Sequence, residues 1–409
     1  MFYGWWMVGV AFYAHLLASG LGFYGLPRLL VPLAEEFSDG QRAGVALLTA
    51  AMSVPGIVVG PLVGRALTRF PLRVVIPCGA AALVLGFLAA SRATQLWHLV
   101  VVYATALPIA VSALSAIGAN ALVGNWFDRR RPFALGVSQF GVSISGALMT
   151  FFIGWTLGLG GWRVTYLWFA GIALVSTPLL WLAITDRPAQ RGLHPDGAAD
   201  ATGDGVAMAL PSLTFGAALR DRNLWLIGMA AGLAFAGTTG LVQNAHAFAT
   251  DAGYRESEAD TMLALISVGA AFGKLLFGYL GMRLGERGSF WCALLGQAVA
   301  MALLPAARAS LPALLGTALL FGLALGGVMP ATTAILARIY GAAGFGPVMG
   351  YLAPMLVPFQ MFGAPIAAAV NDRTGSYDAA VYGFTAACLV AAAALLPVRM
   401  PGTPSERER

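Results

Sequence analysis

Charged residues are scarce in this chain. Only 10% of its 409 residues are Asp, Glu, Lys or Arg, whereas 59% are hydrophobic and the mean hydropathy is +0.78. Soluble domains carry about 25% charged residues, so the composition excludes a water-soluble fold. It predicts an integral membrane protein with many spans of about 20 residues each. The alternation typical of barrel strands is missing, so these spans are expected to be helices.

Several chemical signatures are also missing. Cys78, Cys292 and Cys388 stand in apolar stretches and give no disulfide framework. The sequence contains no Walker loop, no H-E-x-x-H motif and no paired nucleophile and base within its spans. We therefore expect no cofactor, no bound metal and no enzymatic activity. The basic residues are dispersed over short loops, so no nucleic-acid partner is expected.

Acidic side chains are absent from the middle of every predicted span. All eighteen lie in loops, at termini or within a few residues of a span end. The predicted spans hold two basic residues, Arg28 and Lys274, and Lys274 is the only lysine in the chain. A membrane core with two cations and no anion favours a negatively charged substrate.

The hydrophobic pattern predicts an all-α membrane protein with twelve transmembrane helices. Its longest polar stretch, residues 185–222, is rich in Gly, Ala, Asp and Pro, as in a flexible cytoplasmic linker. This linker separates an N-terminal six-helix bundle, 1–184, from a C-terminal six-helix bundle and tail, 223–409. The predicted spans are 5–31, 43–63, 74–91, 98–124, 133–156, 164–184, 223–247, 260–281, 289–307, 312–336, 347–370 and 378–398.

The arginines predict the orientation. With both termini in the cytoplasm, sixteen arginines fall on the inner side and six on the outer side. Cytoplasmic loops are the side enriched in Lys and Arg. We therefore expect a multi-pass protein of the cell (cytoplasmic) membrane, monomeric, with the lipid bilayer as its surroundings and both termini inside.

The two halves contain a repeated motif. Residues 60–69 read GPLVGRALTR and residues 278–287 read GYLGMRLGER, and both fit G-x-L-x-x-R-x-x-x-R at an offset of 218 residues. The motif resembles the signature of the major facilitator superfamily of transporters. In that family the fifth position is Asp, whereas here it is Gly64 and Met282. The resemblance implies a gating role for the arginines of these loops, Arg65, Arg69, Arg283 and Arg287.

A second resemblance is to one branch of that superfamily. The segment NWFDRRRPFALGVSQFGVSISG, residues 125–146, resembles the connection between spans 4 and 5 in the monocarboxylate transporter and oxalate:formate antiporter branch. YGWWMVGV and GFYGLPRLL in span 1 and FGAALRDRNLWLI at the end of the linker are similar to that branch as well. Arg129 and Arg130 in this connection are further candidates for gating. Gly136, Gly141 and Gly146 are expected to serve helix packing.

Lys274 is the first candidate for substrate binding. At 100° per residue, Ser267, Ala270, Ala271 and Gly278 share its side of the helix. An ionisable residue in a span usually faces a cavity. Lys274 lies nine residues before Arg283, roughly 13 Å along a helix, which argues against a side chain that merely reaches the cytoplasmic surface. The resemblance implies that it takes the place of a substrate-binding arginine.

The remaining candidates are weaker. Arg28 matches a basic residue at the outer end of span 1 in the same branch, and the alternative is a side chain that extends to the outer surface. Tyr24 is one turn earlier and can donate a hydrogen bond. His15, Gln243 and His246 are other polar residues in spans, with helix packing the commoner role. The candidate substrate-binding residues are Lys274, Arg28, Tyr24, Ser267, Gln139, Asn244 and Gln360.

Together these features predict a secondary active transporter of small organic anions, with monocarboxylates as the favoured class. Alternating access between the halves would expose a site at their interface. Lysine can lose its proton and arginine cannot, which suggests proton coupling through Lys274. A lysine that stays charged would suit anion exchange instead. A same-fold exporter of neutral or lipophilic metabolites or drugs is the first alternative. An intramembrane enzyme is the alternative from another class, and the missing pair of nucleophile and base argues against it.

Overall fold

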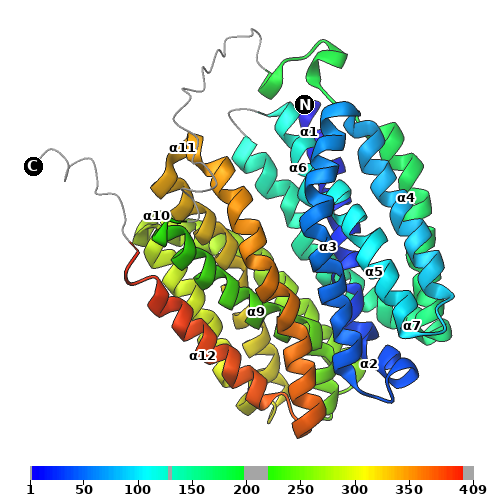
Figure 1. Ribbon diagram of the computed structural model, residues 1–409, viewed down its shortest axis with the longest axis vertical. Helices are drawn as coiled ribbons and strands as arrows, with labels where there is room; N and C mark the ends of the chain where they lie inside the picture. The colour runs from blue at the N-terminus through cyan, green and yellow to red at the C-terminus, as the bar shows by residue number, and fades with distance from the viewer. Residues whose placement is uncertain (1, 128–130, 198–219, 399–409) are drawn as a thin grey trace, which may run out of the picture. The chain divides into compact units, whose positions relative to one another are not determined.

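A computed structural model describes residues 2–127, 131–197 and 220–398 (Figure 1). Within these ranges all regular structure is helical, as predicted. The helices are α1 Gly4–Gly22, α2 Gly25–Phe37, α3 Arg42–Arg69, α4 Leu72–Ser91, α5 Leu96–Val111, η1 Ser112–Ala116, α6 Gly118–Trp126, α7 Arg131–Ala183, η2 Pro188–Arg191, η3 Pro195–Gly197, α9 Arg222–Asp251, α10 Glu256–Ala307, α11 Leu311–Thr374 and α12 Asp378–Ala394.

Glycines divide two of the three longest helices, α7 and α10, into membrane spans. Gly160 and Gly161 interrupt α7, and Gly285 interrupts α10; Gly161 and Gly285 have φ near 74°, a conformation that favours glycine. Helix α11 has 64 residues, roughly 96 Å at helical rise, which is about three times the hydrocarbon thickness. In the described part of the chain, eight helical stretches are long and apolar enough to cross a membrane, and they include α7 and α10 with their breaks. Dividing α7 and α10, and adding the second part of α11 and the shorter α12, accounts for the twelve predicted segments.

The first compact unit comprises Met1–Gly203 and Gln243–Val268. In this unit α1 and α4 pack against α7, and α3 packs against α5 (Figure 1). Aromatic rings fill the contact between α4 and α7, where Phe87 lies 5.7 Å from Tyr166 and 5.2 Å from Phe169 between ring centroids. All three rings are fully buried. The first unit therefore has its own apolar core.

The second compact unit comprises Asp204–Val242 and Gly269–Arg409. Its core gathers apolar side chains from α9, α10, α11 and α12. Gln297 on α10 is fully buried and donates to the carbonyl oxygen of Ala234, at 3.0 Å, and to Oγ1 of Thr238, at 2.9 Å. Helices α9 and α10 contribute to both units. The domain boundaries at 184 and 223 stay a prediction, and residues 198–219 of the predicted linker lie outside the described ranges.

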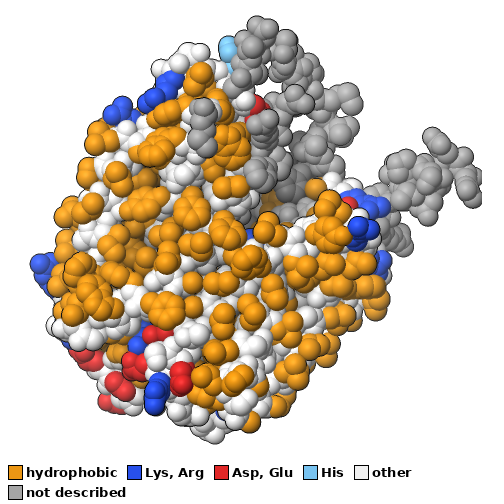
Figure 2. All heavy atoms as spheres, turned by 180° about the vertical axis from the view of Figure 1, so that it is seen from behind, with side chains coloured by type: hydrophobic (Ala, Val, Ile, Leu, Met, Phe, Trp, Pro, Cys, Tyr) orange, Lys and Arg blue, Asp and Glu red, His pale blue; other side chains and the backbone are white. Residues whose placement is uncertain are grey.

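The surface is apolar. Hydrophobic side chains cover most of the face seen in Figure 2, and charged side chains gather toward its margins. On α10, Phe272 and Leu275 are 56% and 66% exposed. Exposed side chains of this size are costly in water and favourable in hydrocarbon. The surface agrees with a protein that spans a bilayer several times.

Candidate functional site

A break in the first predicted span positions Arg28. Helix α1 ends at Gly22, and α2 begins at Gly25 after Phe23 and Tyr24. Pro27 lies in the first turn of α2, where a residue without an N–H is tolerated because that donor has no intrahelical partner. Arg28 therefore stands at the start of a new helix. It is buried, with 5% of its side chain exposed.

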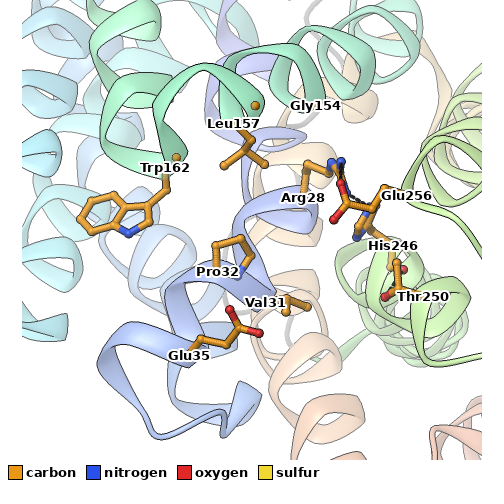
Figure 3. Close-up of a pocket in the computed structure, with 12 residues that line it drawn as sticks. Arg28, Val31, Pro32, Glu35, Gly154, Leu157, Trp162, His246, Thr250 and Glu256 are labelled. Atoms are coloured by element: carbon orange, nitrogen blue, oxygen red, sulfur yellow. Dashed lines mark hydrogen bonds and ion pairs between the residues drawn. The ribbon is translucent and has the colours of Figure 1, made fainter.

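Three side chains surround the guanidinium of Arg28. Nη1 donates to Nε2 of His246 on α9, and Nη2 donates to Oε2 of Glu256 at 2.6 Å. Nε lies 3.2 Å from Oδ1 of Asp260. Figure 3 shows Arg28 and Glu256 pointing toward one another, with His246 beside them. We call these four residues, all in the first unit, the Arg28 cluster.

The start of α10 supplies the two carboxylates. Glu256 is in its first turn, where the positive end of the helix dipole favours an acidic side chain. Asp260 follows one turn later and has 7% of its side chain exposed, against 75% for Glu256. The ESEAD run at 256–260 was assigned by sequence to a span end. The structure corrects the expectation of a core without anions, because Asp260 is buried in the helix and paired with Arg28.

A cavity of about 450 Å³ adjoins the cluster (Figure 3). Arg28, Val31, Pro32 and Glu35 line it from α2, and Trp162 lies on α7. His246 and Glu256 complete its polar side. Among the described residues, Nδ1 of His246 has no hydrogen-bond partner. Because Nε2 accepts a hydrogen bond from Arg28, Nδ1 is the nitrogen that carries the proton of a neutral ring.

Gly154 permits the close packing of the cluster against α7. A Cβ placed on Gly154 would lie 2.9 Å from Oδ2 of Asp260 and 3.5 Å from Nη2 of Arg28. Gly158, one turn later and lining the same cavity, has nothing within 4 Å of its Cβ position among the described atoms. Alanine at position 154 would therefore have to displace the Asp260 carboxylate, whereas alanine at position 158 would displace no described atom.

Two of the predicted substrate-binding residues meet directly. The Tyr24 hydroxyl hydrogen-bonds with the side chain of Ser267, which donates to the carbonyl oxygen of Leu263 at 3.1 Å. Both side chains are buried.

The glycines of α7 were predicted to serve helix packing. A Cβ on Gly146 would lie 2.0 Å from Oγ of Ser267. The packing role predicted for Gly146 is therefore confirmed. It is confirmed for Gly141 as well, because a Cβ placed there would lie 2.3 Å from the carbonyl oxygen of Phe12. Gly136 has no neighbour within 4 Å among the described atoms, so the same prediction is wrong there.

Lys274 is half-buried on α10, two helical turns after Ser267. It follows Gly273, whose Cβ would lie 2.1 Å from the carbonyl oxygen of Leu323 on α11. Ala270 and Ala271 are buried, whereas Phe272 and Leu276 are exposed. The predicted side of small residues thus faces the interior of the second unit over this stretch. Gly278 is an exception to this pattern, because Gly278 is exposed and has no described atom within 4 Å of its Cβ position.

The other predicted polar residues are distributed over both units. Asn244 on α9 is buried, and Gln139 on α7 and Gln360 on α11 are half-buried. His15 is packed, with Nδ1 2.7 Å from Oγ of Ser115. Gln243 donates to the carbonyl oxygen of Phe23 at the α1–α2 break, at 3.4 Å.

The arginines predicted to act in gating lie at helix ends. Arg65 and Arg69 are exposed in the last turns of α3. Arg283 and Arg287 flank the Gly285 break, and Arg287 donates to the carbonyl oxygen of Leu396 at 2.5 Å. Arg283 donates to the hydroxyl of Tyr279 at 3.1 Å. Arg129 and Arg130 lie outside the described residues.

Comparison with known proteins matches the chain to one family of transporters. The family model described as Major Facilitator Superfamily matches residues 1–255 and 229–409. Monocarboxylate transporter 13 of Rattus norvegicus is 26% identical over 92% of this chain and 84% of its own length. Monocarboxylate transporter 11 of Mus musculus is 27% identical over 92% and 83%.

A solved structure shares the fold. It is a bacterial homolog of the human lysosomal transporter Spinster in an inward-facing, unoccupied conformation. The two superpose with a TM-score of 0.71 over 95% of this chain and 96% of the other, at 15% identity. With the twelve-segment helical architecture and the resemblance of its loops, these matches show that the chain is a transporter belonging to the major facilitator superfamily.

Proposed function

We propose that this protein is a secondary active transporter of small organic anions, with monocarboxylates as its substrate class, working by alternating access. The proposal is supported by relatives over most of the chain whose names identify them as monocarboxylate transporters. In transporters of this architecture, substrate sites lie near the bilayer midplane. We place the protein in the cell membrane with both termini in the cytoplasm, on the arginine count, and propose a monomer.

The observation that supports this proposal most strongly is the position of Lys274. Lys274 is the only lysine of the chain and is half-buried in a span. It lies eleven residues before the Gly285 break, roughly 16 Å along the helix, which exceeds the reach of its side chain. An ammonium at that depth provides the counter-charge that a carboxylate needs after it leaves water.

The other predicted residues have supporting roles in this proposal. Tyr24 and Ser267 hydrogen-bond with each other and provide hydroxyl groups along the proposed substrate pathway. Gln139, Asn244 and Gln360 supply amide donors. Arg28 acts on the anion only after its guanidinium leaves Glu256 and Asp260, because in the present conformation Nη1 and Nη2 donate hydrogen bonds and Nε forms an ion pair with Asp260. The arginines at 65, 69, 283 and 287 stabilise the helix ends that shift during gating.

A specific observation favours a second candidate. The buried Asp260 gives the chain an acidic group inside a helix, and proton-coupled exporters of cations use embedded carboxylates. An exporter of neutral or cationic lipophilic compounds therefore stays a candidate. The ion pair with Arg28 weighs against it, because the carboxylate already has a cationic partner.

Uptake by purified protein in liposomes tests the proposal. Labelled lactate, pyruvate, formate and oxalate are compared with the lipophilic cation tetraphenylphosphonium, with and without a proton gradient. We expect uptake of at least one monocarboxylate in wild type and its loss in Lys274→Ala. Transport of the cation with no transport of any anion would favour the exporter.

A further inference from the structure

A second cavity of the first unit, of about 460 Å³, lies where α4 begins and α7 ends. Pro71 and Arg73 line it from the start of α4, and residues 184–186 line it directly after α7. Gln190 and Arg191 of η2 complete its wall. The proposed transport of anions uses none of these residues.

The two arginines of this cavity have no acidic partner in the part of the chain that the structure describes. Asp186 supplies the one carboxylate of the wall, and its Oδ1 accepts the backbone N–H of Arg73 at 2.8 Å. Neither the guanidinium of Arg73 nor that of Arg191 forms an ion pair with a described carboxylate. Both positive charges therefore remain available to an anion.

Aromatic rings and a carbonyl group hold the two guanidinium groups in place. Cζ of Arg73 lies 5.6 Å from the ring centroid of Trp181, and its Nε donates to the carbonyl oxygen of Trp181 at 3.0 Å. Cζ of Arg191 lies 3.8 Å from the ring centroid of Tyr3. These partners are uncharged, so they orient the guanidinium groups without neutralising them. A ligand that binds oriented side chains loses less affinity to their ordering.

The chemistry of the wall fits a phosphate group. Guanidinium groups bind phosphate oxygens through paired N–H donors. Gln190 can add its side-chain NH₂ group, because its Oε1 already accepts the backbone N–H of Asp186 at 3.1 Å. Two guanidinium groups and one carboxylate give the cavity an excess of positive charge, which favours a ligand with a net negative charge.

The surroundings of the cavity favour a lipid as the source of that phosphate. Trp181, whose ring lies against Arg73, is 42% exposed, and Leu179 and Leu182 in the same part of α7 are 52% and 76% exposed. Tryptophan is enriched where a membrane protein passes the lipid headgroups. Basic pockets between transmembrane helices bind such headgroups. The exposed leucines offer the acyl chains an apolar surface that a soluble phosphate compound would not use.

We propose that this cavity binds the headgroup of an acidic phospholipid, with Arg73 and Arg191 on its phosphate and its acyl chains along Trp181 and Leu182. The headgroup connects the start of α4 to η2, which belongs to the segment that follows α7. The arginine count places this end of the first unit on the cytoplasmic side. The site does not depend on which substrate is transported, so it would stand if the proposed function failed.

Native mass spectrometry of the purified, delipidated full chain tests the site. The protein in detergent is titrated with phosphatidylglycerol, phosphatidylcholine or inorganic phosphate alone. We expect wild type to bind one phosphatidylglycerol about fivefold more tightly than phosphatidylcholine, the factor for about one charge contact at a membrane surface. Added salt should reduce this preference, because salt screens the attraction between exposed charges.

Variants of the two arginines locate the binding. Arg73→Gln and Arg191→Gln should each weaken phosphatidylglycerol binding about fivefold, and the double variant about thirtyfold. Arg187→Gln is the matched control, since Arg187 is exposed in the same segment and does not line the cavity. It should bind like wild type. Only variants with a monodisperse elution peak are compared, and Arg191→Gln, which removes no hydrogen bond between described residues, suffices if Arg73→Gln does not fold.

Three results overturn the inference. One is equal binding of phosphatidylglycerol and phosphatidylcholine by wild type. Another is phosphatidylglycerol binding by the folded arginine variants that is no weaker than binding by Arg187→Gln. The third is inorganic phosphate that binds to wild type as tightly as phosphatidylglycerol, which would assign the cavity to a soluble phosphate compound.

Discussion

Nε of Arg28 lies 3.2 Å from Oδ1 of Asp260, and both side chains are more than nine-tenths buried. Removing one partner of a buried ion pair leaves the other charge uncompensated. Such a change costs about 3–5 kcal/mol, whereas an exposed pair contributes about 0–1 kcal/mol. Breaking the Arg28–Asp260 pair is therefore expected to lower the stability of the protein much more than breaking an exposed pair.

Arg28→Gln should lower the stability of the described conformation by about 3–5 kcal/mol. The measurement is the temperature at which purified protein in detergent loses its monodisperse elution peak. Arg338→Gln is the control, because Arg338 pairs with Glu286 at 2.6 Å with both side chains about one-third exposed. Equal transition temperatures for the two variants would show that burial does not increase the contribution of the Arg28 pair to stability.

Arg28→Gln should also weaken anion transport. If the guanidinium attracts and then holds the carboxylate, the apparent Michaelis constant should rise about tenfold, which corresponds to about 1.4 kcal/mol. Added salt should reduce transport by wild type more than by the variant, since salt screens the attraction that the variant lacks. The measurement is initial uptake across ionic strength. Identical curves would exclude a role for Arg28 in anion binding.

Gly154→Ala should disturb the Arg28 cluster, because its Cβ would lie 2.9 Å from Oδ2 of Asp260. Overpacking of this kind costs about 1–3 kcal/mol. Gly158→Ala, one turn along the same helix, has open space at its Cβ position and should gain up to about 1 kcal/mol from helix propensity. Transition temperatures of both variants are compared with wild type. The packing argument fails if Gly154→Ala is as stable as Gly158→Ala.

Gly273→Ala should separate α10 from α11. Its Cβ would lie 2.1 Å from the carbonyl oxygen of Leu323, a backbone atom that cannot rotate away. Gly278→Ala, with no described atom within 4 Å, should be tolerated. We expect a lower transition temperature and lower yield for the first variant alone. Wild-type behaviour of Gly273→Ala would mean that the helices do not touch there.

The sequence predicted the twelve segments because hydrophobic length is a local property. It also identified Arg28 and Lys274, since a basic residue within an apolar run is visible without any fold. The partners of Arg28 were missed because they depend on where α10 begins and what packs there. Glu256 and Asp260 were read as the edge of a span, although helix packing buries Asp260 against Gly154 and Arg28. Gly273 was missed as a close contact for the same reason.

The most direct test of the account is carboxylate binding by purified Lys274→Ala. Removing a desolvated charge from a charge pair costs about 2–5 kcal/mol, an affinity loss of about thirtyfold or more. Isothermal titration with lactate and pyruvate measures it, with a monodisperse elution peak showing that the variant is folded. The account predicts that binding is lost in Lys274→Ala and detectable in wild type. Binding by the variant within about threefold of wild type, under 1 kcal/mol, would contradict it.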